Sequence, residues 1–87
     1  MKRVAILCGG PGSEHEISCL SAGGVLSAIN RNEYEPILIG ITREGQWIAL
    51  PLDYPLSLEN GTLPSVSGNF PEVIRGENGM TVGGAQL

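Results

Sequence analysis

Basic and aromatic residues are scarce in this 87-residue chain. Its five lysines and arginines are outnumbered by nine acidic residues, which leaves a net charge of −4. So little positive charge argues against nucleic acid as a partner, because nucleic-acid-binding proteins usually carry a basic patch. No apolar run approaches the roughly 18 residues that a membrane-spanning helix requires, so we expect no membrane partner.

Cysteine and histidine are also rare. Cys8 and Cys19 form no disulfide framework of the kind found in small secreted domains, so a reducing cytoplasm is the simplest location. The apolar run after Arg3 is shorter than the roughly 7–15 residues of a signal peptide's hydrophobic region. His15 is the single histidine, and without a second histidine or a larger group of acidic residues we expect no metal ligands in this chain.

The front half of the chain, residues 1–50, has the pattern of regular structure. Residues 4–8 form a continuous apolar run, which is typical of a strand buried on both faces of a parallel sheet. A helix over 13–29 and a second strand over 34–42 complete a strand–helix–strand unit with a right-handed crossover. A tight turn then leads into a short strand over 46–49, so the second strand is predicted to fold back as a hairpin.

The start and the buried face of this helix can also be predicted. Ser13 and Glu16 have the capping-box spacing, in which each side chain satisfies an unpaired backbone N–H group. Gly23 and Gly24 each cost about 1 kcal/mol relative to alanine inside a helix, and close packing of the helix on a strand would offset that cost. We expect one apolar face to lie on the sheet; its residues are Ile17, Leu20, Gly24 and Ala28, widened by Val25, Leu26 and Ile29.

The back half, residues 51–87, is rich in proline and glycine and predicts loops. Only residues 72–75 and 80–82 are expected to form short ordered pieces. Two parallel strands are too few for a stable doubly wound sheet. We therefore expect an incomplete α/β domain with a small, Rossmann-like parallel sheet, and a chain that is a fragment of a longer protein.

The junction between the first strand and the helix carries the candidate site. Gly9 and Gly10 allow a ligand to approach the backbone closely, although a plain turn after a buried strand has the same sequence pattern. A dinucleotide fingerprint is disfavoured because His15 stands where the third glycine belongs, and the missing Gly-Lys-Ser/Thr excludes a Walker A loop. His15 is a candidate base, or a packing residue. A carboxylate at a helix start argues against a phosphate site, and Glu14 is the candidate acceptor for an ammonium group.

The stretch GGPGSEHEIS, followed by LSA, resembles the N-terminal signature of the D-alanine–D-alanine ligases. The match begins with the apolar strand and continues through the double glycine, EHEIS and a small-residue helix. The later segment YEPILIGITREGQW is similar to the same family, including relatives that make D-alanyl-D-lactate. The resemblance covers about the first fifty residues well and the rest of the chain poorly. One departure lies at Gly12, where family members usually carry serine and this chain has Ser13 one position later.

This resemblance implies an ATP-grasp enzyme, with residues 1–87 as part of its N-terminal, pre-ATP-grasp domain. In the family, ATP phosphorylates the carboxylate of one D-alanine, and the amine of a second D-alanine attacks the acyl phosphate to form the dipeptide for peptidoglycan. The family's N-terminal glutamate contacts the ammonium of the first D-alanine, and its match here is Glu14. Gly9, Gly10 and Ser18 are implied as further substrate-binding residues.

The resemblance also implies what this stretch lacks. ATP and Mg²⁺ (or Mn²⁺) would be bound by parts of the enzyme outside these residues, so we expect residues 1–87 alone to be inactive. The full-length enzyme is expected to be a cytoplasmic homodimer, with either D-alanine or D-lactate as its second substrate. Two alternatives stay open: a non-catalytic α/β module that binds a nucleotide or small anion, and the N-terminal domain of another ATP-grasp carboxylate–amine ligase.

Overall fold

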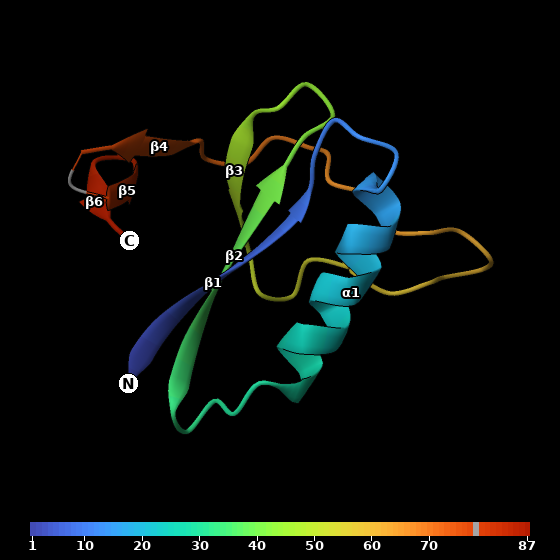
Figure 1. Ribbon diagram of the computed structural model, residues 1–87, viewed down its shortest axis with the longest axis horizontal. Helices are drawn as coiled ribbons and strands as arrows, with labels where there is room; N and C mark the ends of the chain where they lie inside the picture. The colour runs from blue at the N-terminus through green and yellow to red at the C-terminus, as the bar shows by residue number, and fades with distance from the viewer. Residues whose placement is uncertain (78) are drawn as a thin grey trace.

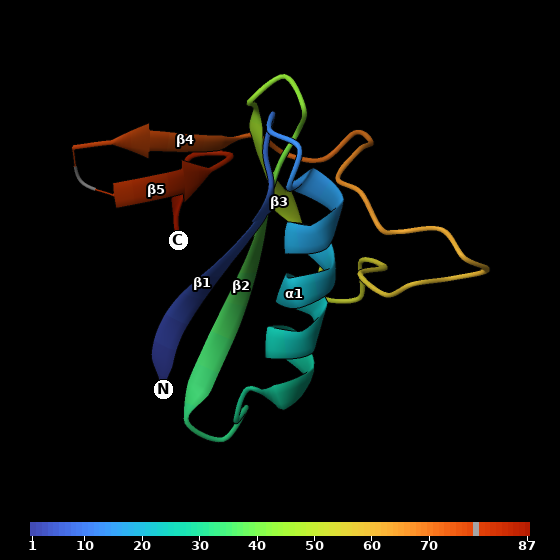
Figure 2. The same cartoon turned by 45° about the vertical axis from the view of Figure 1, so that its right-hand side comes forward.

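The computed structural model of the chain describes residues 1–77 and 79–87. One helix packs on one face of a three-stranded sheet, and a second, smaller sheet lies on the other side (Figures 1 and 2). This arrangement confirms the predicted α/β class. In chain order the elements are β1 (Lys2–Gly9), α1 (His15–Ala28), β2 (Tyr34–Ile41), β3 (Trp47–Leu50), β4 (Val73–Gly76), β5 (Gly79–Val82) and β6 (Ala85–Gln86).

The first sheet has the strand order β1-β2-β3. β1 and β2 run parallel in register, from Lys2 opposite Tyr34 to Gly9 opposite Ile41. β3 folds back antiparallel on β2, and a bond from the Gly45 N–H to the Thr42 carbonyl, 2.9 Å long, closes the turn between them. The predicted strand–helix–strand unit and hairpin are therefore confirmed.

The helix starts differently from the prediction. α1 begins at His15, with Glu14 in the N-cap position, and the Glu14 side chain makes no capping hydrogen bond. The predicted capping box between Ser13 and Glu16 is wrong, because the Glu16 carboxylate instead pairs with the guanidinium of Arg43 in the turn before β3. A contact from a distant turn thus replaces the local one.

The predicted buried face of α1 is also wrong, except for Leu26, which is buried as predicted. Ile17 and Val25 are 49% and 53% exposed, and the face that touches the sheet consists of His15, Cys19, Ala22 and Leu26. The helix carries small or apolar residues on nearly every side, so the hydrophobic periodicity of its sequence indicates only weakly which face is buried. Gly23 packs on a loop, not on a strand: a Cβ at this position would lie 2.5 Å from the Leu56 carbonyl oxygen.

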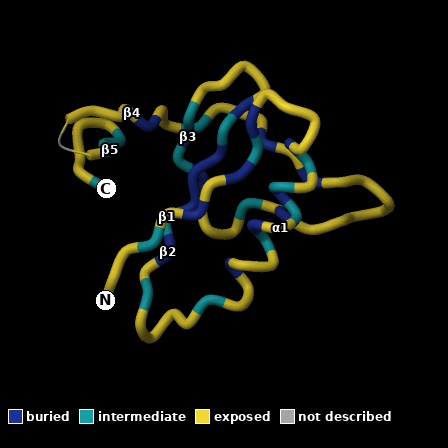
Figure 3. The backbone as a smooth tube through the Cα atoms, viewed as in Figure 1, coloured by how far each residue is buried: buried dark blue, intermediate teal, exposed yellow. Residues whose placement is uncertain are grey.

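The main core lies between the first sheet and α1, and a long loop from the back half of the chain closes it (Figure 3). The sheet and the helix supply most of the apolar side chains, while two residues of the loop, Leu56 and Val66, fill the remaining space. Among the described residues, the buried members of this cluster are Ile6, Cys8, Cys19, Ala22, Leu26, Leu38, Ile48, Leu50, Leu56 and Val66.

β1 is buried on one face only, which corrects the prediction of a strand covered on both. Cys8 is 3% exposed and Ile6 7%, whereas Leu7 between them is 43% exposed. α1 covers a single face of the sheet, and β1 lies at the edge of the described sheet. β2, in the middle, is covered more completely, with Leu38 and Ile39 at 1% and 0% exposure.

The back half contains more regular structure than its composition suggests. β4, β5 and β6 form an antiparallel meander, and the two ordered pieces predicted at 72–75 and 80–82 correspond to β4 and β5. Within the described residues, no helix is both long and apolar enough to cross a membrane.

Two contacts join the second sheet to the first. The Ala49 N–H donates to the Pro71 carbonyl at 2.8 Å, which extends the first sheet beside β3. The guanidinium of Arg75 lies 4.2 Å from the ring centroid of Trp47. Trp47 therefore helps to hold β4 in place through a cation–π contact.

Candidate functional site

The candidate site lies at the carboxyl ends of β1 and β2, where ligands of open α/β sheets usually bind. Three segments meet at this edge: the turn from β1 to α1, the turn over 42–46, and the loop over 65–68 (Figure 1). They are far apart in the sequence. Parallel pairing of β1 with β2 brings the first two together, and a hydrogen bond from the Val66 N–H to His15 at the start of the helix brings in the third.

Glu14 occupies the position predicted for it. It is exposed at the start of α1, and its carbonyl oxygen accepts the Ser18 N–H at 2.9 Å. Among the described residues, none forms a hydrogen bond or ion pair with the Glu14 carboxylate. The carboxylate is therefore open to a cation from outside the chain.

The other three predicted site residues form a framework under Glu14. Gly9 and Gly10 both have positive φ, at 94° and 105°. The Gly9 N–H donates to Ser18 Oγ at 2.7 Å, and the Gly10 N–H donates to the Ile41 carbonyl at 2.8 Å. These bonds fix the turn from both sides. Direct contact of Gly9, Gly10 or Ser18 with a substrate stays a prediction.

Close packing explains why position 9 is occupied by glycine. A Cβ at this position would lie 2.2 Å from the Ile41 carbonyl oxygen and 3.0 Å from Val66. In contrast, a Cβ at Gly10 or Gly12 would meet none of the described atoms within 4 Å. Space for a ligand thus exists on the Gly10–Gly12 side of the turn, while Gly9 serves the contact between β1 and its neighbours.

His15 is completely buried, with 0% exposure, and both of its ring nitrogens are engaged. Nδ1 lies 2.7 Å from the Gly10 carbonyl oxygen, and Nε2 lies 2.9 Å from the backbone nitrogen of Val66. Of its two predicted roles, packing is therefore confirmed. The sequence pattern could not identify the loop partner, because Val66 is 51 residues away and no local motif surrounds it.

Glu16 and Arg43 form an exposed ion pair beside Glu14. The pKa of Glu16 is lowered, first by a hydrogen bond from its own backbone N–H and then by the Arg43 guanidinium. The pair ties the turn before β3 to the first turn of the helix. Arg43 was not predicted as part of the site, since its partner lies 27 residues away.

The two cysteines are not suited to nucleophilic chemistry. Burial raises the pKa of the Cys8 thiol to about 12, with the neighbouring Cys19 adding to the shift, and burial also raises the pKa of Cys19. Both thiols stay protonated near neutral pH, and only the thiolate is nucleophilic. In the part of the chain that the structure describes, no group of three or more His, Cys, Asp or Glu side chains is placed to hold a metal ion.

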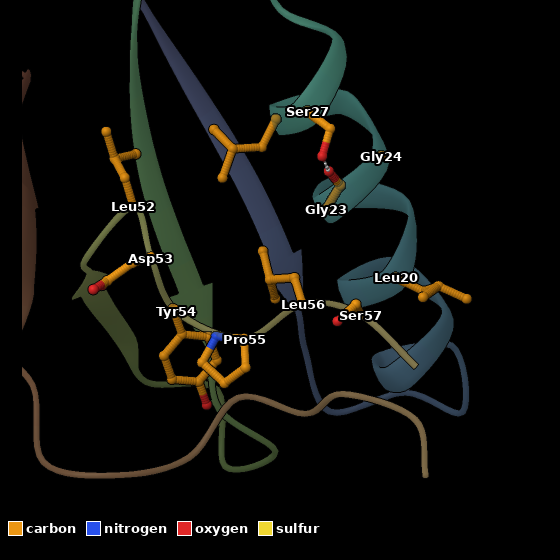
Figure 4. Close-up of a pocket in the computed structure, with 11 residues that line it drawn as sticks. Leu20, Gly23, Gly24, Ser27, Leu52, Asp53, Tyr54, Pro55, Leu56 and Ser57 are labelled. Carbon is orange, nitrogen blue, oxygen red and sulfur yellow. Dashed lines mark hydrogen bonds between the residues drawn. The ribbon is translucent and has the colours of Figure 1, made fainter. Parts of the chain in front are cut away.

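Two of the cavities lined by the described residues are relevant to the choice of site. One, of about 280 Å³, lies at the carboxyl edge between the turn over 42–46 and the loop over 65–68. The other, of about 490 Å³, is a mostly apolar groove between the C-terminal half of α1 and residues 52–57 (Figure 4). Its lining includes Leu20 and Leu56 but not Glu14. We place the candidate site at Glu14, because a free carboxylate and the strand ends coincide there.

The family model described as "D-ala D-ala ligase N-terminus" matches residues 3–81. This range contains β1 from Arg3 onward and every element from α1 to β4, including the turn that carries Glu14, so the similarity also extends into the back half of the chain. The chain belongs to the D-alanine–D-alanine ligase family.

Individual relatives support this family membership. A D-alanine–D-alanine ligase of Paenarthrobacter aurescens is 46% identical over 78 residues, which cover 88% of this chain and 21% of the relative. One of Bifidobacterium longum is 40% identical over 89 residues, covering 94% of this chain and 22% of the relative. The chain thus spans about a fifth of the length of these ligases.

Solved structures of such ligases share the fold. The D-alanine–D-alanine ligase of Coxiella burnetii superimposes with a TM-score of 0.72 at 18% identity, over 94% of this chain and 24% of that protein. The VanG D-Ala:D-Ser ligase of Enterococcus faecalis gives 0.70 at 27% identity, over 93% of this chain and 24% of that protein. Ligases named for different second substrates share this fold, so the fold alone does not identify the second substrate.

Proposed function

We propose that residues 1–87 form part of the N-terminal domain of an ATP-dependent ligase that joins two D-alanines for peptidoglycan, and that Glu14 binds the ammonium group of the first D-alanine. The supporting observation is the open Glu14 carboxylate at the carboxyl edge of the sheet, on a turn held by hydrogen bonds from both sides. Family membership supports the reaction class.

The Glu14 carboxylate is better suited to orienting the substrate than to transferring protons. A negatively charged side chain interacts favourably with the helix dipole near a helix N-terminus, and a charged acceptor binds a substrate ammonium strongly and directionally. Holding the amino end of D-alanine in one place fixes where its own carboxylate lies, and such positioning lowers the barrier of a bimolecular step. Gly9, Gly10 and Ser18 are proposed to border the same substrate.

ATP and Mg²⁺ do not fit the residues described here. Mg²⁺ is usually held by carboxylates together with substrate phosphates, and the described residues contain no acidic cluster. The chain's basic residues are few and scattered. We therefore propose that the remaining four-fifths of the ligase binds both groups and that residues 1–87 alone are inactive. In keeping with the family resemblance, we also propose that the whole enzyme is a cytoplasmic homodimer.

A chimera tests this proposal. Residues 1–87 replace the matching segment of the Paenarthrobacter aurescens ligase, and Glu14→Gln is compared with Glu59→Gln on a distant, exposed loop. Loss of one charge-assisted hydrogen bond, worth about 1.5–3 kcal/mol, should raise the KM for the first D-alanine by about 10- to 100-fold. The KM for ATP should not change, and Glu59→Gln should behave like the unmutated chimera.

Two results contradict the proposal. One is a Glu14→Gln chimera with an unaltered KM for the first D-alanine. The other is tight binding of mononucleotides to residues 1–87 alone in calorimetry, which would favour the non-catalytic binding module instead.

A further inference from the structure

His15 is a buried side chain that the proposed chemistry leaves without a role. It is fully buried at the first position of α1, directly after Glu14. Its ring joins two segments: the glycine turn, through the carbonyl of Gly10, and the loop over 65–67, through the backbone of Val66. We call residues 65–67 the strap.

The two partners determine the tautomer of His15. The Gly10 carbonyl can only accept a hydrogen bond, so Nδ1 carries the proton and donates at 2.7 Å. The backbone N–H of Val66 can only donate, so Nε2 is unprotonated and accepts at 2.9 Å. A neutral imidazole has one donor and one acceptor nitrogen, and both are used here. His15 is therefore held in a single orientation and has no nitrogen left for proton transfer.

The strap has a second anchor that is independent of the helix. The Tyr54 hydroxyl donates to the Ser65 carbonyl at 2.7 Å and accepts the Ser67 N–H at 3.1 Å. The ring of Tyr54 is itself packed edge-on against Phe70, with ring centroids 5.6 Å apart. The strap would thus keep one attachment without His15, whereas the Gly10 carbonyl would lose its only side-chain partner among the described residues.

We infer that His15 is a positioning residue for the first D-alanine: its bond to Gly10 fixes the turn from which Glu14 projects. The inference rests on the proposed function of Glu14. Glu14 lies between the two ends of this bond in the chain, so the His15–Gly10 contact closes a small loop around it. Loosening that loop displaces the carboxylate, and a displacement of 1 Å from a productive geometry costs about 100-fold in rate.

Three substitutions in the chimera separate the two bonds of His15. The amide nitrogen of His15→Asn can take the place of Nδ1 and keep the bond to Gly10. The amide oxygen of His15→Gln can take the place of Nε2 and keep the bond to Val66. His15→Leu keeps neither. Each of the two amide variants loses one hydrogen bond, so a purely structural role predicts similar losses of stability and no change in the KM of the folded enzyme.

The positioning role predicts an asymmetric result. His15→Gln and His15→Leu should raise the KM for the first D-alanine by about 10- to 100-fold, with the KM for ATP unchanged, while His15→Asn should stay near the unmutated value. Tyr54→Phe, which loosens only the strap, should lower stability and leave this KM unchanged. Equal KM values in His15→Asn and His15→Gln would overturn the inference, even where His15→Leu fails to fold.

A second measurement keeps the inference distinct from the proposed function. If the unmutated chimera shows no activity that depends on D-alanine, the proposed function fails, and hydrogen exchange at the amides of residues 12–14 in the same protein decides the role of His15. Exchange that is faster in His15→Gln than in His15→Asn supports control of the turn by His15. Equal exchange in the two variants refutes it.

Discussion

Replacing Gly9 with alanine should destabilise the domain by several kcal/mol, on the order of 2–5 kcal/mol. The φ of 94° at Gly9 is costly for a residue with a side chain, by about 1–2 kcal/mol. The new Cβ would also lie 2.2 Å from the Ile41 carbonyl oxygen, a backbone atom that no side-chain rotation can move. To relieve this contact, the end of β1 must separate from β2.

That separation breaks a specific hydrogen bond. The Gly10 N–H donates to the same Ile41 carbonyl at 2.8 Å, and leaving a buried backbone group unpaired costs about 1–3 kcal/mol. The expected total for Gly9→Ala is therefore about 2–5 kcal/mol. A domain of this size has a free energy of unfolding of about 4–13 kcal/mol, so the variant should be close to unfolding at the lower end of that range.

Two neighbouring glycines provide matched controls. Gly10 has a φ of 105° but open space around its Cβ position among the described atoms, so Gly10→Ala should cost only the conformational term of about 1–2 kcal/mol. Gly12 has neither constraint within the described structure, and Gly12→Ala should be neutral or stabilise by up to about 1 kcal/mol. Urea unfolding followed by the fluorescence of Trp47, the single tryptophan, measures all three. Equal losses for Gly9→Ala and Gly10→Ala would refute the steric argument.

Two further predictions concern the buried thiols and the contact between the sheets. Because the pKa of Cys8 rises from an ordinary value of 9.0 to about 12 in the folded chain, the free energy of unfolding should be unaffected by this thiol below pH 9. It should then fall between pH 9 and 12, by at most about 1.4 kcal/mol per pH unit; Cys8→Ala should flatten the slope in urea titrations, and an unchanged slope would contradict the assignment. Arg75→Gln should cost about 0.5–1 kcal/mol through loss of the cation–π contact with Trp47, whereas Arg31→Gln, on an exposed turn, should cost nothing measurable.

Local sequence patterns were sufficient to predict which helix and strands form in residues 1–50. The apolar runs predicted β1 and β2, and Gly45 marked the turn before β3, because strand length and turn chemistry depend on neighbouring residues. The rotation of α1 could not be predicted in the same way. The buried face of α1 includes His15, which a hydrophobicity pattern places outside the core. The burial of His15 depends on its hydrogen bonds with Gly10 and Val66.

In the candidate site too, local sequence predicts some parts, while others depend on contacts between distant residues. Glu14 and the glycine turn could be predicted, since a strand, a turn and a helix start are contiguous in the chain. The strap could not, because no sequence pattern connects Val66 to a residue 51 positions earlier. Composition was also a poor guide to residues 73–86, where short antiparallel strands pair with one another and need no long apolar run.

The pairing of Arg43 bears directly on why Glu14 is open. Glu14 and Glu16 are two residues apart at a helix start, so their side chains point in different directions. The one basic side chain of the turn over 42–46, Arg43, binds Glu16, and this pairing compensates its charge within the fold. Glu14 keeps an uncompensated negative charge at the strand ends, among described residues that offer it no cation. This difference supports the proposal that Glu14, and not Glu16, binds an ammonium group from outside the chain, because Glu16 is already paired with Arg43.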